Sequence, residues 1–277
     1  MKNMTKDIRN KLIMSILSDY LNNSSSFITK EMIDSLKDFN LSITERIVLL
    51  LLGYYDIENK ELTIELNKII EELDKEKYEN NEYYKNIKLD NIKDKNWSFE
   101  TKSYKPYELF VYNDLENIDG KLYPKIGYFT SEYFYPCVLE NNREWMLITP
   151  NEIETMQNSI NEAYGNVLTY GLGLGYYQYM ISNKDDVKSI TIIEKDKKII
   201  DLFTKYILPQ YKFKDKIKII NEDALKYKYN NEYDYVFVDI WHDPSDGIEL
   251  YKKMKKLEKP NIKYSYWIEK TLKNYVN

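Results

Sequence analysis

Three glycines at alternate positions mark the most distinctive segment of the chain, LTYGLGLGYYQYM at residues 168–180. Gly171, Gly173 and Gly175 follow a short apolar run of the β type. Because glycine has no Cβ, the chain can turn sharply there and another group can approach the main chain closely. A buried strand that enters a helix through such a turn can bind a nucleotide, although a plain tight turn has the same residues. The glycines therefore need support from other parts of the sequence.

Acidic residues follow three further apolar segments, at the positions where strands would end. Glu194 follows SITII, nineteen residues after Gly175, about where an acidic side chain accepts hydrogen bonds from ribose hydroxyl groups. Asp223 follows IKIINE and could accept from the exocyclic amine of an adenine. Asp239 ends the apolar run YVFV. Since ligands of an open α/β sheet bind at the carboxyl ends of its strands, these residues predict one nucleotide site.

The residue after the third glycine distinguishes a dinucleotide-binding site from other nucleotide sites. A dinucleotide fingerprint has a third small residue there, so that helix and strand pack closely. This chain has Tyr176 at that position. The sequence therefore disfavours NAD as the ligand.

His242 and Asp243 lie shortly after Asp239, in the segment YDYVFVDIWHDP. An imidazole titrates near neutral pH, so His242 could remove a proton from an acceptor, with Asp243 orienting the ring. A histidine in a loop can equally be an incidental surface or packing residue. We take Asp239, His242 and Asp243 as the candidate catalytic residues.

Composition restricts the class of protein. The 45 acidic and 40 basic residues are mixed along the chain and give a net charge of −5, which argues against a nucleic-acid partner. One cysteine, Cys137, and one histidine leave no disulfide framework and no Cys–His zinc cluster, so no metal site is expected. No apolar run approaches the length that spans a bilayer. We expect a soluble, cytoplasmic protein without a membrane partner.

Three successive regions supply the elements that must position these residues. Residues 1–95 show helical periodicity, with a capping box formed by Ser42 and Glu45 and a further amphipathic helix over residues 59–78. Residues 96–149 contain short aromatic and β-branched runs, which predict a small β region. Residues 150–277 alternate helices with nearly continuous apolar strands. The fold class is therefore α/β: a Rossmann-like, doubly wound parallel sheet preceded by a helical N-terminal domain and a small β region.

The ordered segments VLTYGLGLG, ITIIEKD, IKIINEDAL and YDYVFVDIWHDP resemble those of class I S-adenosylmethionine-dependent methyltransferases, especially the spermidine-synthase-like branch. The resemblance covers about the last half of the chain, and it implies that S-adenosylmethionine is the cofactor. It also implies a set of cofactor-binding residues, from the methionine part through the ribose and adenine to the amino group or acceptor: Gly171, Gly173 and Gly175, then Glu194 and Lys195, then Asp223 and Ala224, and finally Asp239.

Two segments depart from the spermidine-synthase-like branch. Aminopropyltransferases have an acidic residue inside a GGGDGG-type turn, whereas residues 171–177 read GLGLGYY. Their catalytic aspartate lies in a D-S-x-D-P segment, whereas the segment at residues 239–244 is one residue longer and contains His242. The acceptor pocket is therefore expected to differ.

The chain is short after the candidate catalytic segment. The 34 residues that follow Asp243 are too few for the helix, fifth strand, further helix and terminal hairpin of a complete class I sheet, so the sheet is expected to be C-terminally truncated. The segment IKYSYWIEKTL could form one strand or a terminal helix. The N-terminal region or a second copy of the chain could cover the missing edge, which allows a homodimer.

These features together predict an S-adenosylmethionine-dependent methyltransferase that acts on an unidentified small-molecule acceptor. An aminopropyltransferase of the spermidine synthase type and a non-catalytic S-adenosylmethionine-binding module are the alternatives. In the related branch the helix that begins at Pro150 faces the acceptor cavity, so Glu152 and Gln157 are secondary candidates. The tyrosines after the glycines could attract the sulfonium of the cofactor or could pack against the sheet.

Overall fold

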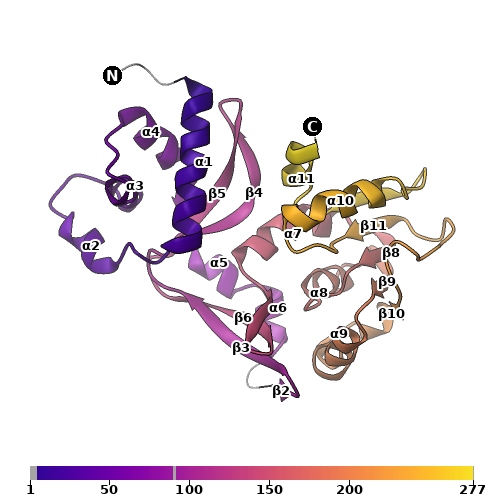
Figure 1. Cartoon of the computed structure of the whole chain (residues 1–277). Coiled ribbons are helices and arrows are strands. Elements are labelled where there is room, and N and C mark those ends of the chain that lie inside the picture. Colours follow the sequence, from indigo (N-terminus) through magenta and orange to yellow (C-terminus); the bar gives the residue numbers. More distant parts are fainter. Residues whose placement is uncertain (1–4, 90–91, 277) are drawn as a thin grey trace. The chain divides into compact units, whose positions relative to one another are not determined.

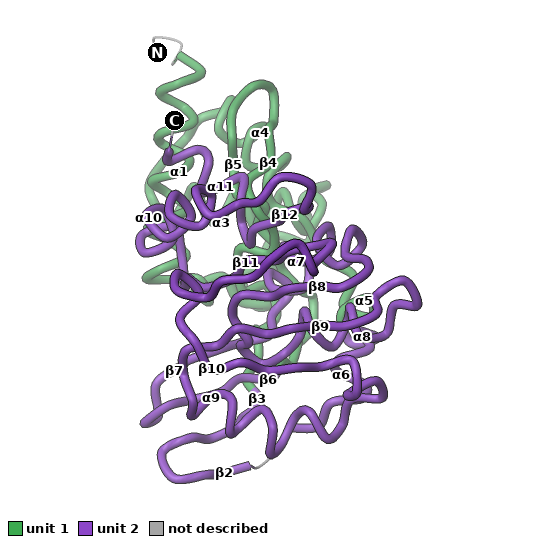
Figure 2. Tube along the Cα trace, turned by 90° about the vertical axis from the view of Figure 1, so that its right-hand side faces the viewer, with its two compact units in different colours: residues 1–78, 102–135 green, residues 79–101, 136–277 purple. Residues whose placement is uncertain are grey.

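The computed structural model describes residues 5–89 and 92–276, and the chain divides into two compact units (Figure 1). Unit 1 comprises Met1–Tyr78 and Lys102–Tyr135, and unit 2 comprises Glu79–Thr101 and Pro136–Asn277 (Figure 2). The chain therefore leaves unit 1 and returns to it before it completes unit 2. This division differs from three consecutive regions because segments that are distant in the sequence fold together.

Unit 1 consists of helices packed on a three-stranded sheet. Its strands lie in the order β1 (Ile70–Glu72), β5 (Lys121–Tyr128) and β4 (Phe110–Ile118). β1 is parallel to β5, whereas β4 and β5 form an antiparallel hairpin. The helices are α1 (Lys6–Asn23), α2 (Lys30–Ser35), α3 (Ile43–Tyr54), α4 (Lys60–Ile69) and, at the unit boundary, α5 (Lys75–Glu79).

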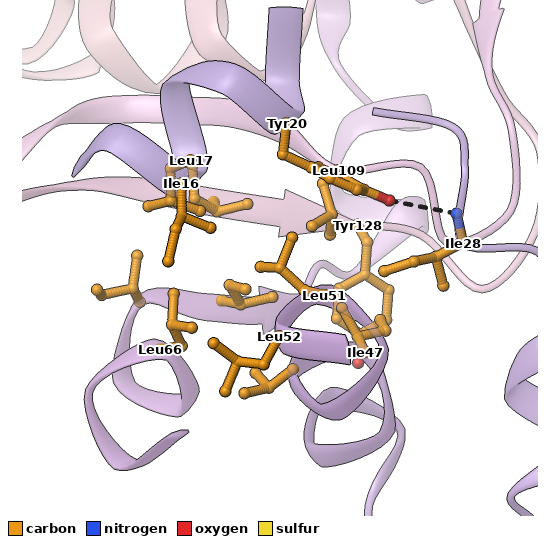
Figure 3. Packing of buried hydrophobic residues seen from close by; sticks show 14 of the residues in the cluster. Ile16, Leu17, Tyr20, Ile28, Ile47, Leu51, Leu52, Leu66, Leu109 and Tyr128 are labelled. Carbon is orange, nitrogen blue, oxygen red and sulfur yellow. Dashed lines mark hydrogen bonds between the residues drawn. The ribbon is translucent and has the colours of Figure 1, made fainter. Parts of the chain in front are cut away.

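The apolar stripes of these helices meet the sheet in one core (Figure 3). Ile16 and Tyr20 of α1 and Leu51 of α3 are buried together with Tyr128 of β5. The Tyr20 hydroxyl accepts a hydrogen bond from the backbone N–H of Ile28 at 3.2 Å, which satisfies a phenol that is otherwise out of reach of water. Unit 1 thus has its own hydrophobic core.

Two predictions for the N-terminal helices have different outcomes. The capping box is confirmed, because the Ser42 hydroxyl accepts from the Glu45 N–H at 3.2 Å while the Glu45 carboxylate accepts from the Ser42 N–H at 2.7 Å. The prediction of a single helix over residues 59–78 is wrong for the middle of that segment, where the chain forms β1 instead. Ile70 is 1% exposed in that strand, so burial against β5 outweighs the helical periodicity of the segment.

The main sheet of unit 2 has five parallel strands in the order β10 (Ile217–Asn221), β9 (Val187–Glu194), β8 (Gly165–Tyr170), β11 (Tyr235–Val238) and β12 (Lys263–Tyr266) (Figure 2). The chain adds strands on one side of β8 and then on the other, so strand order reverses between β8 and β11. The predicted Rossmann-like, doubly wound sheet is confirmed. The carboxyl ends of β8 and β11 therefore border the expected binding crevice.

Helices cover this sheet on both faces. The helices of unit 2 are α6 (Glu82–Asn86), α7 (Pro150–Glu162), α8 (Tyr176–Ser182), α9 (Lys197–Leu202), α10 (Pro244–Lys255) and α11 (Glu269–Val276), of which α6 packs on α8 and α11 on α10. α8 covers one face: the Tyr177 ring stacks on Phe237 of β11 at 3.9 Å between centroids, and Gln178 contacts Thr169 of β8. A π-helical turn (Phe203–Ile207) and short 3₁₀ turns continue α9 toward β10.

The crossover between β10 and β11, residues 222–234, contains no helix in the described chain. Tyrosine side chains take the place of one. Tyr227 lies 6.5 Å from Tyr170 of β8 between ring centroids, and its hydroxyl is 3.0 Å from that of Tyr233. Tyr170 is 2% exposed and Tyr233 is 8% exposed, so tyrosine rings of this crossover pack against the sheet.

The predicted small β region is an antiparallel sheet in the order β2 (Lys93–Asp94), β3 (Trp97–Tyr104), β6 (Tyr133–Glu140) and β7 (Arg143–Leu147). Strands β3 and β6 each begin in one unit and end in the other. The chain therefore passes between the units along strands of this sheet.

The residues after Asp243 form more of the sheet than expected. They supply α10, the fifth strand β12 and α11, so the segment IKYSYWIEKTL gives both a strand and a helix. No terminal hairpin follows within the described residues, which end at 276. No helix among the described residues is long and apolar enough to cross a membrane.

Candidate functional site

The glycine loop, residues 171–175, joins β8 to α8 at the point where strand order reverses. Gly171, Gly173 and Gly175 have φ values of 93°, 54° and 76°, a region in which residues with a Cβ are strained. A Cβ on Gly171 would lie 1.8 Å from the carbonyl oxygen of Asp239, and one on Gly175 would lie 2.4 Å from the Phe203 ring. The protein's own packing therefore requires glycine at these two positions, before any ligand is considered.

A small pocket of unit 2 lies against this loop, with a cavity volume of about 20 Å³. Its walls come from β7 and the start of α7, from the glycine loop and α8, and from the end of β11. The residues that line it are Met146, Leu147, Ile148, Glu152, Met156, Leu172, Gly173, Leu174, Tyr176, Tyr177, Gln178 and Asp239. The structure thus brings two of the predicted cofactor residues, Gly173 and Asp239, to one cavity.

Met146 lines this wall directly beside Gly173. A Cβ on Gly173 would lie 2.3 Å from the terminal methyl carbon of Met146, so the methionine side chain rests directly on the glycine loop. Methionine is unbranched and adapts its rotamers at little cost. A ligand that approaches the loop backbone would displace this side chain rather than main-chain atoms.

The segment before β2 braces the glycine loop from a distant part of the sequence. The Tyr83 hydroxyl donates to the Leu174 carbonyl at 2.6 Å, and the Asn81 amide nitrogen donates to the Tyr176 hydroxyl at 3.1 Å. Neither residue could be predicted from the sequence, because a contact across 91 residues leaves no local pattern.

Two carboxylates face the pocket without partners. Glu152 comes from the first turn of α7, and Asp239 follows β11. Among the described residues, neither side chain makes a hydrogen bond or an ion pair. Burial and the nearby charge of Glu194 raise the pKa of Asp239 to about 7. Burial and the charge of Asp239 raise the pKa of Glu152 well above its ordinary value. The secondary candidate Glu152 is therefore part of the site.

Glu194 fixes the geometry of the loop. Its carboxylate accepts hydrogen bonds from the backbone N–H of Leu172 at 3.1 Å and from that of Asp196 at 2.7 Å. The first bond ties the glycine loop to the end of β9. The predicted ribose-binding role of Glu194 is compatible with this position, since each carboxylate oxygen has a second lone pair.

The other predicted cofactor residues lie along the same edge of the sheet. Lys195 follows β9, and Asp223 and Ala224 follow the adjacent strand β10, with Asn221 opposite Glu194 in the register. The Asp223 carboxylate accepts from the Leu225 N–H at 2.9 Å and shapes the turn. None of these three lines the pocket, and their roles in binding stay predictions.

His242 lies outside the pocket, with 78% of its side chain exposed. Its Nδ1 is 3.1 Å from the carboxylate of Asp246, whereas the Asp243 side chain caps α10 and accepts from the Ser245 N–H at 2.6 Å. The expectation that Asp243 orients His242 is therefore wrong: Asp243 serves the helix terminus, and Asp246, one turn into α10, holds the ring. His242 is not among the residues that line the pocket, and its catalytic role stays a prediction.

The aromatic residues after the glycines are mainly packing residues. Tyr176 and Tyr177 are 4% and 2% exposed, and the Tyr177 hydroxyl donates to the Ser159 carbonyl at 3.3 Å. Both also line the pocket. Within the described ranges, no group of three His, Cys, Asp or Glu side chains is arranged to hold a metal ion.

The sheet order and the glycine loop at the strand-order reversal define a Rossmann-like α/β fold. Residues 150–260 match the family model described as "Spermine/spermidine synthase domain". The resemblance to the spermidine-synthase-like branch is thereby confirmed over this part of the chain. A comparison with curated proteins gave no match.

Solved structures that match part of this chain include a spermidine synthase and methyltransferases. Spermidine synthase from Thermotoga maritima is 17% identical, with 47% of this chain and 49% of that chain covered and a TM-score of 0.34. A dimethyladenosine transferase from Plasmodium falciparum is 19% identical, with 44% and 43% covered and a TM-score of 0.33. A putative methyltransferase from Thermoplasma acidophilum is 21% identical, with 36% and 42% covered and a TM-score of 0.27. The chain thus spans just under half the length of these structures.

Proposed function

We propose that unit 2 binds S-adenosylmethionine and transfers its methyl group to a small-molecule acceptor. The observation that carries the proposal is the pair of unpartnered carboxylates, Glu152 and Asp239, in a pocket against the glycine loop at the strand-order reversal. Such a pocket favours a positively charged ligand. S-adenosylmethionine fits this demand, since it supplies a reactive methyl group on a positively charged sulfur.

Different residues of the chain would bind different parts of the cofactor and the acceptor. The glycine loop would receive the methionine part against its backbone, and Glu194 with Lys195 would hold the ribose while Asp223 and Ala224 border the adenine. Glu152 and Asp239 would lie on the acceptor side, where a carboxylate can take a proton from the attacking atom. His242, which does not line the pocket, would reach an acceptor only outside it.

Calorimetry tests the proposal. We expect the purified protein to bind S-adenosylmethionine and S-adenosylhomocysteine and not NAD. Glu194→Ala should weaken binding about 10- to 100-fold, the usual effect of removing a charged hydrogen-bond partner. The exposed neighbour Glu222, changed to alanine, is the matched control and should keep full affinity.

Because Glu194 also accepts two backbone hydrogen bonds, its variant should lose stability without ligand as well. Affinity must therefore be measured under conditions in which both proteins are folded. Affinity for NAD combined with no response to either sulfur nucleoside would overturn the proposal.

Aminopropyl transfer is the second candidate, because the match to the spermine/spermidine synthase domain and an acidic pocket both favour an amine acceptor. The glycine loop argues against it, since Leu172 and Leu174 occupy the positions between the glycines and no acidic residue is present. Turnover of decarboxylated S-adenosylmethionine with a diamine would identify this activity. Binding without transfer to any acceptor in cell extracts would favour a non-catalytic module.

A further inference from the structure

Helix α3 of unit 1 is apolar on two faces. Its four consecutive leucines, residues 49–52, span about 300° around the helix axis, because each residue is turned by about 100° from the one before it. A single core cannot take all four. Ile47, Leu51 and Leu52 lie in the core of unit 1 (Figure 3). Within the described chain, the opposite face of α3 has no helix or strand packed on it that would bury Leu49.

The outward face of α3 consists of five residues three or four positions apart, which therefore lie side by side on the helix. They are Arg46, Leu49, Leu50, Gly53 and Tyr54. Leu49 and Tyr54 are 49% and 42% exposed, and Leu50 is partly buried. Adjacent exposed apolar side chains of this kind are typical of a surface that another molecule covers.

The Tyr54 ring is held in place although it is exposed. It packs edge-on against the rings of Tyr20, Phe27 and Tyr55, at 5.7, 4.8 and 4.9 Å between centroids. Its hydroxyl lies 2.9 Å from that of Ser24. A rigid aromatic side chain loses little conformational entropy on binding, so tyrosine is common at the centre of interfaces. Tyr54 is therefore suited to contact a partner.

Arg46 brings a positive charge to the outward face. Its side chain is partly buried and its Nε atom is fully buried, and it has no hydrogen-bond or ion-pair partner among the described residues. Buried donors are almost always satisfied in proteins. A guanidinium can stack on an aromatic ring, and arginine is enriched at the centre of interfaces. Arg46 thus lacks a partner that a second molecule could supply.

Gly53 has no evident role within the single chain. It lies in the last turn of α3 without a positive φ, so its backbone does not require glycine. A Cβ there would meet nothing within 4 Å, so packing does not require glycine either. Glycine in a helix is less stable than alanine. At a contact between two helices, however, a small residue lets the helix axes come closer.

The outward face is complementary to a second copy of itself. If two α3 helices pair antiparallel about a two-fold axis between Leu49 and Leu50, Leu49 of each copy meets Leu50 of the other. Arg46 of each copy then lies opposite Gly53 of the other and beside Tyr54. The gap at Gly53 admits the guanidinium, and the Tyr54 ring receives its charge. Each contact occurs twice, because a two-fold interface uses the same surface on both copies.

We propose that the outward face of α3 joins two copies of this chain in an antiparallel, two-fold symmetric homodimer. A second copy supplies both chemistries that the face requires, an apolar surface for the leucines and an aromatic ring for the guanidinium. The homodimer would form through a helix face, and not through the edge of the main sheet. It is independent of the proposed function, since α3 belongs to unit 1 and none of its residues lines the pocket.

The first experiment measures the association of the full chain by sedimentation velocity, from about 1 to about 200 µM. We expect a reversible monomer–dimer equilibrium. Leu49→Lys, which places a charge at the apolar centre, should weaken dimerisation about 10-fold or more. Ile8→Lys on α1 is the matched control, because Ile8 is 53% exposed, and it should leave the dissociation constant unchanged. A parent that stays monomeric throughout, or an equal effect of both variants, would overturn the proposal.

The second experiment tests the antiparallel pairing with a double-mutant cycle. Gly53→Lys opposes the charge of Arg46, and Arg46→Glu removes the cation from Tyr54, so each should weaken dimerisation about 10-fold or more. The double variant Arg46→Glu/Gly53→Lys brings opposite charges together twice and should recover most of the loss. In a parallel pair each position would face itself, so the double variant would oppose like charges. Absence of recovery would therefore overturn the antiparallel arrangement.

Folding controls accompany both experiments. Leu49 is half exposed and Gly53 has open space around it, so Leu49→Lys and Gly53→Lys should keep the parental far-ultraviolet circular dichroism spectrum. Their urea unfolding midpoints at about 1 µM, where the parent is mostly monomeric, should match that of the parent. Weaker dimerisation with these properties unchanged would assign the effect to the interface.

Discussion

Asp239 combines two tasks in one residue. Its backbone N–H donates to the Tyr170 carbonyl at 2.9 Å, and its own carbonyl occupies the space that a side chain at Gly171 would need. Its side chain, in contrast, faces the pocket without a partner. The backbone of Asp239 thus sets the position of the glycine loop, while its carboxyl group sets the charge beside that loop.

Replacement of Asp239 by asparagine should make stability less sensitive to pH. The folded-state pKa of about 7 lies above the unfolded value, so this group costs no stability below about pH 4 and an increasing amount as pH rises toward 7. Relative to the parent, Asp239→Asn should therefore gain about 1–3 kcal/mol between pH 4 and pH 8. Urea unfolding at both pH values measures the difference. The exposed Asp185, changed to asparagine, is the control, and an equal change in both variants would contradict the assignment.

The residues that could be predicted are those whose position in the sequence fixes their position in the fold. Gly171, Glu194 and Asp239 each follow a strand of a parallel sheet, so a strand prediction places all three at one edge. Tyr83 and Met146 could not be predicted in this way, because only tertiary packing brings them to the loop. The partner of His242 was missed for a local reason: an N-cap aspartate is engaged by its helix.

At the level of elements, lysine side chains cap the C-terminal ends of two helices of unit 2. Lys184 Nζ donates to the carbonyl groups of Ile160 and Asn161, among others, at the end of α7. Lys216 Nζ donates to the Ser182 carbonyl at the end of α8. The last carbonyls of a helix lack intrahelical partners, so these ammonium groups satisfy them and complement the helix dipole. The helices that flank the pocket are thereby held at their far ends.

The turn between β8 and α8 should be much less tolerant of substitution than an ordinary hairpin turn. Gly175 and Gly120 have similar φ values, 76° and 82°, but a Cβ meets Phe203 at 2.4 Å in the first case and nothing within 4 Å in the second. Gly120→Ala should cost about 1 kcal/mol from backbone strain alone. Gly175→Ala should cost about 1–3 kcal/mol more, because it overpacks a buried site.

Urea unfolding followed by far-ultraviolet circular dichroism, which reports both units, measures the two costs. Equal costs would mean that the Phe203 ring moves aside freely.

The secondary-structure elements of the main sheet could largely be predicted from the sequence, because apolar runs indicate its strands. The segment at residues 59–78 was not, because its periodicity suits a helix while its central residues are needed at a sheet edge.

At the level of the whole molecule, the tryptophans report on one unit only. All four, Trp97, Trp145, Trp241 and Trp267, belong to unit 2, which also contains every residue of the pocket. S-adenosylmethionine at 100 times its dissociation constant should raise the free energy of unfolding reported by tryptophan fluorescence by about 2.7 kcal/mol. Glu194→Ala at the same ligand concentration should show a smaller gain. An unchanged fluorescence transition at saturating ligand would place the binding site elsewhere.

The interrupted course of the chain has a consequence during synthesis on the ribosome. Unit 1 has all of its segments once Tyr135 has emerged, although residues 79–101 have appeared earlier and belong to unit 2. The Tyr83 hydroxyl can donate its hydrogen bond to the Leu174 carbonyl only after a further 91 residues have been synthesised. We therefore expect residues 79–101 of the nascent chain to gain most of their contacts only after the rest of unit 2 has been synthesised.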